Sequence, residues 1–343
     1  MARVLVVATS RKTRGGITSV IKAHETGPQW KKYHCHWVQT HRDGPGWRKI
    51  LYLAYGWLDY MIRLPFYDIV HFHISLQTTV KRKLPFVILA KTFKKKVIVH
   101  LHCGSQIDEI WNEQYNNIFR EADLGVFLSH NLQEKVESHT GCCQKYRVVY
   151  NPCPDVNNDS IEPKGNIVLF SGTLYLAKGY SDLLKAFASI APRHKDWKVV
   201  FAGNGEVEQG KLIAKQLGIS DQVVFLGWVS GETKDKAFRE AGVFCLPSYA
   251  EGFPMAVLDA WAYGLPVITT PVGGIPDVAK DGENLLLFNP GDIGKLAEQL
   301  ELMITDSALR SRIAAASLAF ATNEFNVNKI NEQIGALYEE LSR

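Results

Sequence analysis

Residues 248–271 read SYAEGFPMAVLDAWAYGLPVITTP, and this stretch is the most informative part of the sequence about the fold. An apolar run at 242–246 precedes it and predicts a short buried strand, and Gly252 and Pro254 then punctuate a tight loop. Residues 255–263 are apolar at helical spacing and stop at a glycine, after which LPVIT begins a second strand. A strand, a loop, a helix and a strand in this order are typical of the βαβ unit of a parallel sheet.

The loop of this stretch carries groups that suit a nucleotide or a sugar phosphate. It places free backbone N–H groups at the start of the predicted helix, which is a favourable site for an anion. Glu251 lies in the loop and Asp259 follows eight residues later in the helix. Carboxylates accept hydrogen bonds from hydroxyl groups, so the stretch predicts one site for an anion and for hydroxyls.

The motif EGFP followed by LDAWAYGLPVI resembles the signature of the retaining GT-B glycosyltransferases of family four, in which two glutamates have seven residues between them. In that family the first glutamate contacts the donor sugar and the second holds the ribose of the nucleotide. The resemblance implies these roles for Glu251 and Asp259, although Asp259 is one methylene shorter than the usual glutamate. The alternative is a surface glutamate and a helix aspartate with no shared task. The segment implied to lie beneath the sugar is Gly252, Phe253, Pro254 and Met255.

A glycine turn after the first strand of the second half is the expected diphosphate site. Most family members have an arginine directly after the first glycine, here Gly172, and a lysine five residues later, and both bind the diphosphate. Lys178 matches this pattern, whereas Thr173 stands where the arginine is expected. A cation that stabilises charge developing on a leaving group contributes about 2–4 kcal/mol. Either Arg11 or Arg14 substitutes for the missing arginine, or the enzyme is slow or inactive.

Two other predicted strands lead to further candidate donor contacts. Gly15 and Gly16 lie in a basic loop after the strand expected at 3–8, and glycines at such a turn let the backbone approach a ligand closely. In the family this loop faces the donor phosphates; the alternative is a solvated loop. Trp228 lies in the strand expected at 222–230, near the nucleotide base in the family, where it either stacks on the base or packs against the protein.

The strand expected at 96–102 ends in His102. Ligands of open α/β sheets bind beyond the carboxyl ends of the strands, so His102 is expected to point toward that crevice. The resemblance places it close to the transferred sugar, where it stabilises developing positive charge. His100 is expected to pack inside, and His71 and His73 on the neighbouring strand are core or cleft wall.

Length and composition are those of a soluble globular protein with two domains. The chain has 343 residues, of which 46% are hydrophobic and 22% charged. No apolar run approaches the roughly 20 residues that span a bilayer. The first residues read as a buried strand and not as a signal peptide, so the six cysteines are expected to be reduced thiols in a cytosol.

The net charge of +4 hides an asymmetry between the two halves. Residues 1–155 hold 22 Lys and Arg against 12 Asp and Glu, which is +10, and the rest hold 17 against 23, which is −6. Residues 46–96 interleave aromatic and aliphatic groups with basic ones, and 80–96 hold seven basic residues and no acidic one. This pattern favours an anionic membrane surface. A helix with a solvated basic face is the alternative, and no nucleic-acid-binding motif accompanies the pattern.

These elements and the resemblance predict an α/β fold with the GT-B architecture, two Rossmann-like domains facing each other across a cleft. The acceptor-side domain is expected at 1–155 and the nucleotide-sugar-binding domain at 166–320, with a linker at 156–166. A last amphipathic helix at 324–343 is expected to cross back onto the first domain. The resemblance covers 166–320 strongly and the first domain in outline.

The expected reaction is transfer of a hexose-type sugar, with retention, from a nucleotide-sugar to a glycan or lipid-linked acceptor in bacterial surface polysaccharide synthesis. A UDP-sugar is favoured and a GDP-sugar is possible. His102, Glu251 and Lys178 are the expected catalytic residues. The resemblance implies no cofactor and no metal, which agrees with the absence of an Asp-x-Asp motif. The expected location is the cytoplasm, at the inner face of the membrane.

Two other functions remain open. A sugar-nucleotide epimerase shares the fold, and a binding protein that has kept the fold without turnover would explain Thr173 and Asp259.

Overall fold

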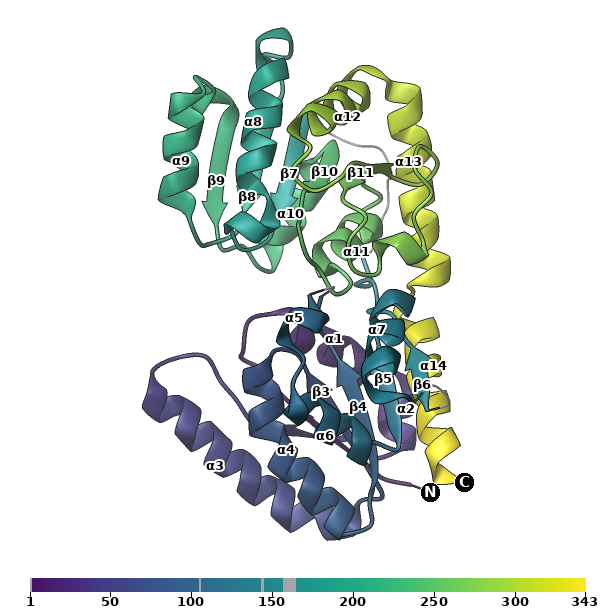
Figure 1. Cartoon of the computed structure of the whole chain (residues 1–343). Helices are drawn as coiled ribbons and strands as arrows, with labels where there is room; N and C mark the ends of the chain where they lie inside the picture. The colour runs from purple at the N-terminus through teal and green to yellow at the C-terminus, as the bar shows by residue number, and fades with distance from the viewer. Residues whose placement is uncertain (1, 105, 143–144, 157–164) are drawn as a thin grey trace. The chain divides into compact units, whose positions relative to one another are not determined.

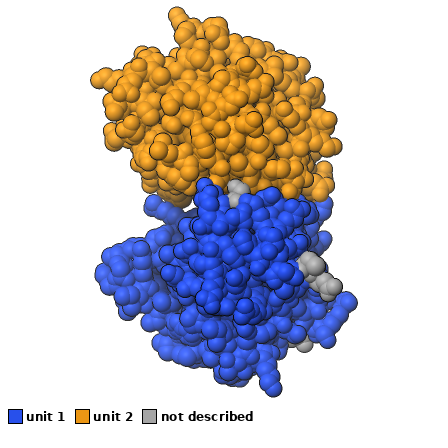
Figure 2. Space-filling model, in the orientation of Figure 1, with its two compact units in different colours: residues 1–152, 327–343 blue, residues 153–326 orange. Residues whose placement is uncertain are grey.

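The computed structural model describes residues 2–104, 106–142, 145–156 and 165–343. The chain divides into two compact units, the first formed by Met1–Pro152 with Val327–Arg343 and the second by Cys153–Asn326 (Figure 2). Most of the predicted linker at 156–166 lies outside the described residues. Each unit has its own parallel sheet with helices packed against it (Figure 1).

The sheet of the first unit has the strand order β2-β1-β3-β4-β5-β6, and all neighbouring strands run parallel. Its central strands are near-continuous apolar runs because both of their faces are covered. The strands are β1 (Val4–Ala8), β2 (His36–Gln39), β3 (Ile69–Ile74), β4 (Lys96–Leu101), β5 (Leu124–Phe127) and β6 (Tyr146–Val148).

Helices cover both faces of this first sheet. Leu5 and Val7 of β1 face the cluster that contains residues of α3, α4 and α6, whereas Val4 and Val6 face the cluster that contains residues of α1 and α14. The C-terminal helix thus completes the core of the first unit, as the sequence predicts. The helices are α1 (Gly16–Glu25), α2 (Pro28–Lys32), α3 (Gly46–Arg63), α4 (Gln77–Thr92), α5 (Ile107–Ile110), α6 (Glu113–Glu121), α7 (His130–Thr140) and α14 (Val327–Ser342).

The second unit has the strand order β12-β11-β10-β7-β8-β9, again with parallel neighbours. The chain runs outward from β7 in one direction and returns at β10 to run in the other, so the order reverses between β7 and β10. Ligands of such sheets bind at the carboxyl ends of the strands beside this reversal. The strands are β7 (Ile167–Ser171), β8 (Lys198–Ala202), β9 (Val223–Gly227), β10 (Val243–Leu246), β11 (Val267–Thr269) and β12 (Leu286–Leu287).

The helices of the second unit connect these strands and cover the sheet (Figure 1). Helix α8 packs against α9 and α12, whereas α11 packs against α13 and β10. These helices are α8 (Tyr180–Ile190), α9 (Val207–Gln216), α10 (Glu232–Glu240), α11 (Met255–Ala262), α12 (Ile293–Thr305) and α13 (Ser307–Ala319).

Two predicted boundaries differ from the structure for local reasons. The strand expected to continue to residue 230 ends at Gly227, where a φ of 68° turns the backbone out of the sheet. The last helix begins at Val327 and not at 324, because a π-helical turn occupies Phe320–Glu324. The ring of Phe325 packs on Trp261, and its carbonyl accepts a 2.8 Å hydrogen bond from the N–H of Cys153, which holds the chain out of the helical path.

Among the described residues, no helix is long and apolar enough to cross a membrane.

Candidate functional site

The stretch 248–271 folds as its sequence predicts. Strand β10 ends at Leu246, the loop continues to Pro254, and α11 begins at Met255. Pro254, with a φ of −69°, precedes the first helical residue, and no side chain caps the helix. The first N–H groups of a helix have no acceptor within the helix. The N–H groups of the first turn of α11 are therefore suited to bind an anion or a sugar oxygen.

Lys178 and Glu251, 73 residues apart, meet at the carboxyl ends of β7 and β10. The ammonium group of Lys178 donates to Oε1 of Glu251, and the hydroxyl of Ser248 donates to the same oxygen at 2.7 Å. The two side chains of the ion pair are 19% and 11% exposed. Both groups are partly open to solvent, so a ligand can separate them: its phosphate would then bind the lysine, and its hydroxyls would bind the glutamate.

The position of Lys178 depends on the glycine that follows it. Gly179 has a φ of 69°, and a Cβ there would lie 2.0 Å from the carbonyl oxygen of Pro247. Glycine is the residue that permits both this backbone conformation and this close approach. The N–H of Tyr249 also donates to the carbonyl of Ala177 at 2.9 Å. The lysine turn is thereby fixed against the loop that follows β10.

Asp259 has an ion-pair partner that the sequence analysis did not predict. Its Oδ2 lies 2.7 Å from the ammonium nitrogen of Lys234 on α10. Burial raises the pKa of the Asp259 carboxyl, and the charge of Lys234 acts in the opposite direction. The pattern ETKDK around Lys234 is that of a solvated helix face, so only the packing of α10 beside α11 reveals the pair.

The glycine turn after β7 meets a second glycine turn after β8. A Cβ on Gly203 would lie 1.7 Å from the carbonyl oxygen of Gly172, and the N–H of Gly172 donates to Ala202 at 3.1 Å. Thr173 is exposed at this junction. Trp228 is also exposed, at 47%, directly after the turn at Gly227.

Of the residues after Glu251, Gly252 holds the loop through its backbone and Phe253 has a buried side chain. The carbonyl of Gly252 accepts a 2.7 Å hydrogen bond from the N–H of Gly274, which holds the loop in place. The ring of Phe253 is buried against Trp261 and Phe325, so its side chain belongs to the core and only its backbone is left for a ligand.

In the first unit the glycine loop precedes α1. Gly15 has a φ of 137° at the N-terminal end of this helix, and Gly16 is its first residue. The guanidinium of Arg11 is bound by Glu25 of the same helix and lies over the ring of Trp37. Arg11, one of the two expected substitutes for the missing arginine, therefore already has a carboxylate partner within its own unit.

His102 follows β4 and belongs to a stack of histidines. Its Nε2 lies 2.8 Å from Nδ1 of His73, and burial lowers the pKa of His102 to about 3. It is thus a neutral imidazole. His71, His73 and His100 are buried behind it, as the sequence predicts for His100.

The nitrogen atoms of His71, His73 and His100 lie within 4.8 Å of one another. Three imidazoles at this spacing are a candidate set of metal ligands. Their rings are nearly parallel, with interplanar angles of 25°, 8° and 32°. The in-plane lone pairs therefore run side by side and do not converge on one point, and this arrangement does not fit a metal ion.

Comparison with known proteins matches part of the chain to a family. Residues 155–318 match the family Glycosyl transferases group 1. An uncharacterized glycosyltransferase of Haemophilus influenzae is 27% identical over 65% of this chain and 56% of its own length. An uncharacterized glycosyltransferase of Methanocaldococcus jannaschii is 32% identical over 55% of this chain and 52% of its own length. The matches thus span about half the length of these two relatives.

A solved structure is similar over almost the whole chain. The Anabaena protein HepE, in complex with UDP-glucose, superposes with a TM-score of 0.79 at 19% identity, over 99% of this chain and 100% of that chain. A likeness at this identity concerns the fold, whereas the family match concerns the unit that carries Lys178, Glu251 and Asp259. Residues 155–318, which lie within the second unit, therefore match the glycosyl transferases group 1, and the whole chain has the GT-B fold.

Proposed function

We propose that this protein transfers a hexose-type sugar from a nucleotide-sugar to an acceptor hydroxyl with retention of the anomeric configuration. The observation that carries the proposal is the Lys178–Glu251 ion pair beside the start of α11. It supplies a cation for a diphosphate, a carboxylate for sugar hydroxyls and free N–H groups in one place. Binding groups alone do not make a catalyst, but a cation at the leaving group acts most strongly in the transition state.

Each residue has a distinct part in the proposed reaction. Lys178, helped by the close backbone approach at the Gly172 turn, stabilises the negative charge that develops on the departing diphosphate. Glu251 leaves the lysine and accepts hydrogen bonds from the sugar, while Asp259 accepts them from the ribose. His102 offers a lone pair of a neutral imidazole to the sugar. The reaction needs no metal ion in this proposal, because the cationic side chain performs the charge stabilisation.

A UDP-sugar is the favoured donor, with a GDP-sugar as the second candidate. The support is HepE, which has been solved with UDP-glucose and has the same fold. In this proposal Trp228, which is 47% exposed after β9, stacks on the base.

The proposed acceptor is a growing or lipid-linked glycan of a bacterial surface polysaccharide, at the cytoplasmic face of a membrane. The support is the basic first half of the chain, whose charge of +10 suits an anionic surface.

The test is nucleoside diphosphate release from a panel of UDP-, GDP-, ADP- and TDP-sugars in the presence of a chelator. Wild type is compared with Glu251→Ala and with Lys211→Ala, a matched control because Lys211 forms an exposed ion pair on α9. Consumption of one donor that Glu251→Ala abolishes and Lys211→Ala preserves supports the proposal. An epimerised free nucleotide-sugar without acceptor would identify an epimerase. Donor binding without turnover, with every acceptor tried, would identify a binding protein.

A further inference from the structure

Helix α3 presents a row of large apolar side chains to solvent. Soluble proteins rarely expose contiguous apolar patches of this kind unless they bind something there. In an 18-residue helix the charged residues are Arg48, Lys49, Asp59 and Arg63. The exposed apolar side chains, which we call the α3 ridge, are Trp47 (60% exposed), Ile50 (70%), Leu51 (58%), Tyr55 (58%), Leu58 (57%), Met61 (48%) and Ile62 (70%).

The face of α3 opposite the ridge already packs against the protein core. Gly56 brings α3 so close to β2 that a Cβ there would lie 2.6 Å from the carbonyl oxygen of Gln39. Tyr60 is fully buried, and its hydroxyl donates to the carbonyl of Phe86 on α4 at 2.8 Å. Trp57 stacks on the same Phe86 at 3.9 Å between ring centroids. Because the inner face is already packed, the ridge is fixed in its outward direction.

The charges around the ridge are basic. Asp59 is bound by both His36 and Arg63, so it adds no free negative charge. Helix α4, which lies beside α3 (Figure 1), adds the exposed Ile88. The segment from α4 to β4 holds the exposed Lys81 and Lys94. Lys96 is also exposed, but it lies 3.7 Å from a carboxylate oxygen of Asp123. An apolar face bordered by Lys and Arg fits the interface of an anionic bilayer, where each basic residue contributes about 1 kcal/mol. A second copy of this chain would instead place two basic faces against each other.

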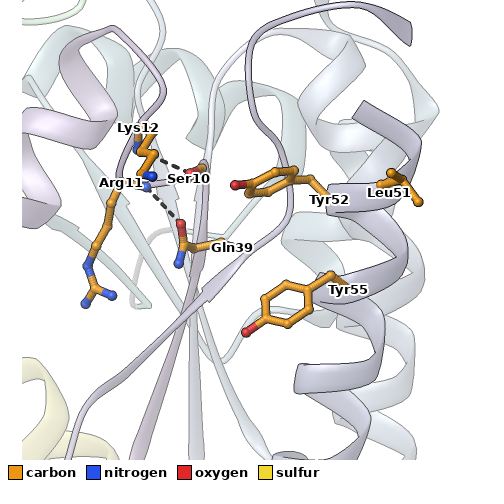
Figure 3. A pocket seen from close by; sticks show the side chains of 7 residues that line it. All are labelled: Ser10, Arg11, Lys12, Gln39, Leu51, Tyr52 and Tyr55. Atoms are coloured by element: carbon orange, nitrogen blue, oxygen red, sulfur yellow. Dashed lines mark hydrogen bonds between the residues drawn. The ribbon is translucent and has the colours of Figure 1, made fainter. Parts of the chain in front are cut away.

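A pocket opens beside the ridge and shares residues with it. Its volume is about 460 Å³, and it is lined by Ser10, Arg11, Lys12, Gln39, Leu51, Tyr52 and Tyr55. Figure 3 shows the two tyrosine rings extending from α3 toward the loop after β1. Leu51 and Tyr55 belong both to the pocket and to the ridge, so a molecule in the pocket borders the same surface as the bilayer.

The pocket combines aromatic walls with positive charge. Arg11 is engaged by Glu25, whereas Lys12 is exposed in the loop. Arg42 donates to the hydroxyl of Tyr52 at 2.9 Å and lies over its ring. Tyrosine rings suit the faces of sugars, and the cations of Lys12 and Arg42 suit a phosphate.

We propose that the α3 ridge docks on an anionic lipid bilayer and that the adjoining pocket takes the phosphate-bearing head of an acceptor lipid from that bilayer. The docking does not depend on the transferase function, whereas the assignment of the lipid as an acceptor rests on the proposed function.

The docking is tested by co-flotation of the full chain with vesicles. Vesicles of phosphatidylcholine with phosphatidylglycerol are compared with phosphatidylcholine alone, at low and high salt. The variant Ile50→Ser/Ile62→Ser removes two ridge side chains, and Leu212→Ser/Leu302→Ser is the matched control on the second unit, with side chains 47% and 40% exposed. We expect salt-sensitive binding to the anionic vesicles, weakened roughly tenfold or more per ridge side chain and unchanged in the control.

Several results would overturn the docking. These are equal binding by the ridge variant, equal binding to neutral vesicles, or no binding to anionic vesicles at low salt. A concentration-dependent dimer in sedimentation that the ridge variant abolishes would assign the ridge to a second copy. Circular dichroism and the melting temperature show whether each variant is folded. UDP binding, measured in parallel on the second unit, separates failure of the docking from failure of the transferase function.

The pocket is tested with vesicles that contain a polyprenyl phosphate, at a surface charge matched by phosphatidylglycerol. We expect tighter binding to the polyprenyl phosphate, which Lys12→Gln and Arg42→Gln remove while binding to phosphatidylglycerol persists. Inorganic phosphate is the competitor that distinguishes the sources. If inorganic phosphate fully displaces the protein from the polyprenyl phosphate vesicles, the pocket is a free-phosphate site. Equal affinity for the two kinds of vesicle would show that the pocket does not distinguish their head groups.

Discussion

Replacing Lys178 and Glu251 separately is expected to move UDP affinity in opposite directions. In the ligand-free protein each neutralises the other, and both side chains are largely buried. Lys178→Met removes the cation that a diphosphate would contact, so UDP binding and turnover both fall. Glu251→Gln keeps an acceptor for the hydroxyl of Ser248 and releases the lysine, so UDP binds more tightly while sugar transfer falls.

The magnitudes follow from the type of contact. Loss of a charge-stabilising contact at a leaving group costs about 2–4 kcal/mol, or roughly 30- to 900-fold in kcat/KM. A hydrogen bond to a charged group contributes about 1.5–3 kcal/mol, which is the upper limit of what Glu251→Gln can return to UDP binding. Isothermal titration with UDP gives the affinities, and UDP release gives kcat and KM.

The control is Lys211→Met, whose side chain is 55% exposed in a surface pair. It removes the same charge from the same unit and is expected to change neither quantity. The reasoning is refuted if Glu251→Gln binds UDP more weakly than wild type, or if Lys178→Met binds UDP as well as wild type.

Three further substitutions test the packing around the site. Burial lowers the pKa of His100, so the wild type loses free energy of unfolding as pH falls below 6.5, the pKa of an unfolded histidine. His100→Leu is expected to reduce this loss by about 1.4 kcal/mol per pH unit in acid titrations of unfolding. An unchanged slope would contradict this prediction. Gly179→Ala is expected to lower the melting temperature and kcat/KM together, since a Cβ meets the carbonyl of Pro247, and a variant with wild-type melting and turnover would rule out the steric argument. Asp259→Asn is expected to gain stability relative to wild type as pH rises through the raised pKa of Asp259, where the wild-type carboxyl ionises against its burial; denaturant titrations at several pH values measure this, and a constant difference would show that Lys234 fully compensates the charge.

The sheet and half of the candidate donor site are predictable because they follow from local periodicity. Lys178 and Glu251 each follow an apolar strand, and the carboxyl ends of neighbouring parallel strands lie at one edge of the sheet. Given that β7 and β10 are neighbours, their meeting requires no knowledge of side-chain packing.

Contacts between helices are not predictable in this way. Lys234 lies among alternating charges, a pattern that any solvated helix face shows, and its pairing with Asp259 depends on how α10 and α11 pack. The apolar residues of α3 likewise predict a helix but leave open which of its sides is buried. Gly56 decides this, because its missing side chain lets one face of α3 reach the backbone of β2.

The two ion pairs suggest what the threonine at position 173 changes, which is the net charge of the candidate site. The second unit carries Lys178 and Lys234 near the donor groups, and each is matched by a carboxylate, Glu251 and Asp259. These pairs sum to zero charge, whereas an arginine after Gly172 would add an unmatched cation. A diphosphate must therefore displace a carboxylate before it meets a full positive charge. We expect UDP alone to bind weakly, because its ribose can satisfy Asp259 but nothing in UDP replaces Lys178 as the partner of Glu251. A complete donor is expected to bind better because its sugar hydroxyls satisfy Glu251. We therefore expect Thr173 to favour discrimination between the complete donor and UDP, because both would contact the same lysine but only the donor offers hydroxyls to Glu251.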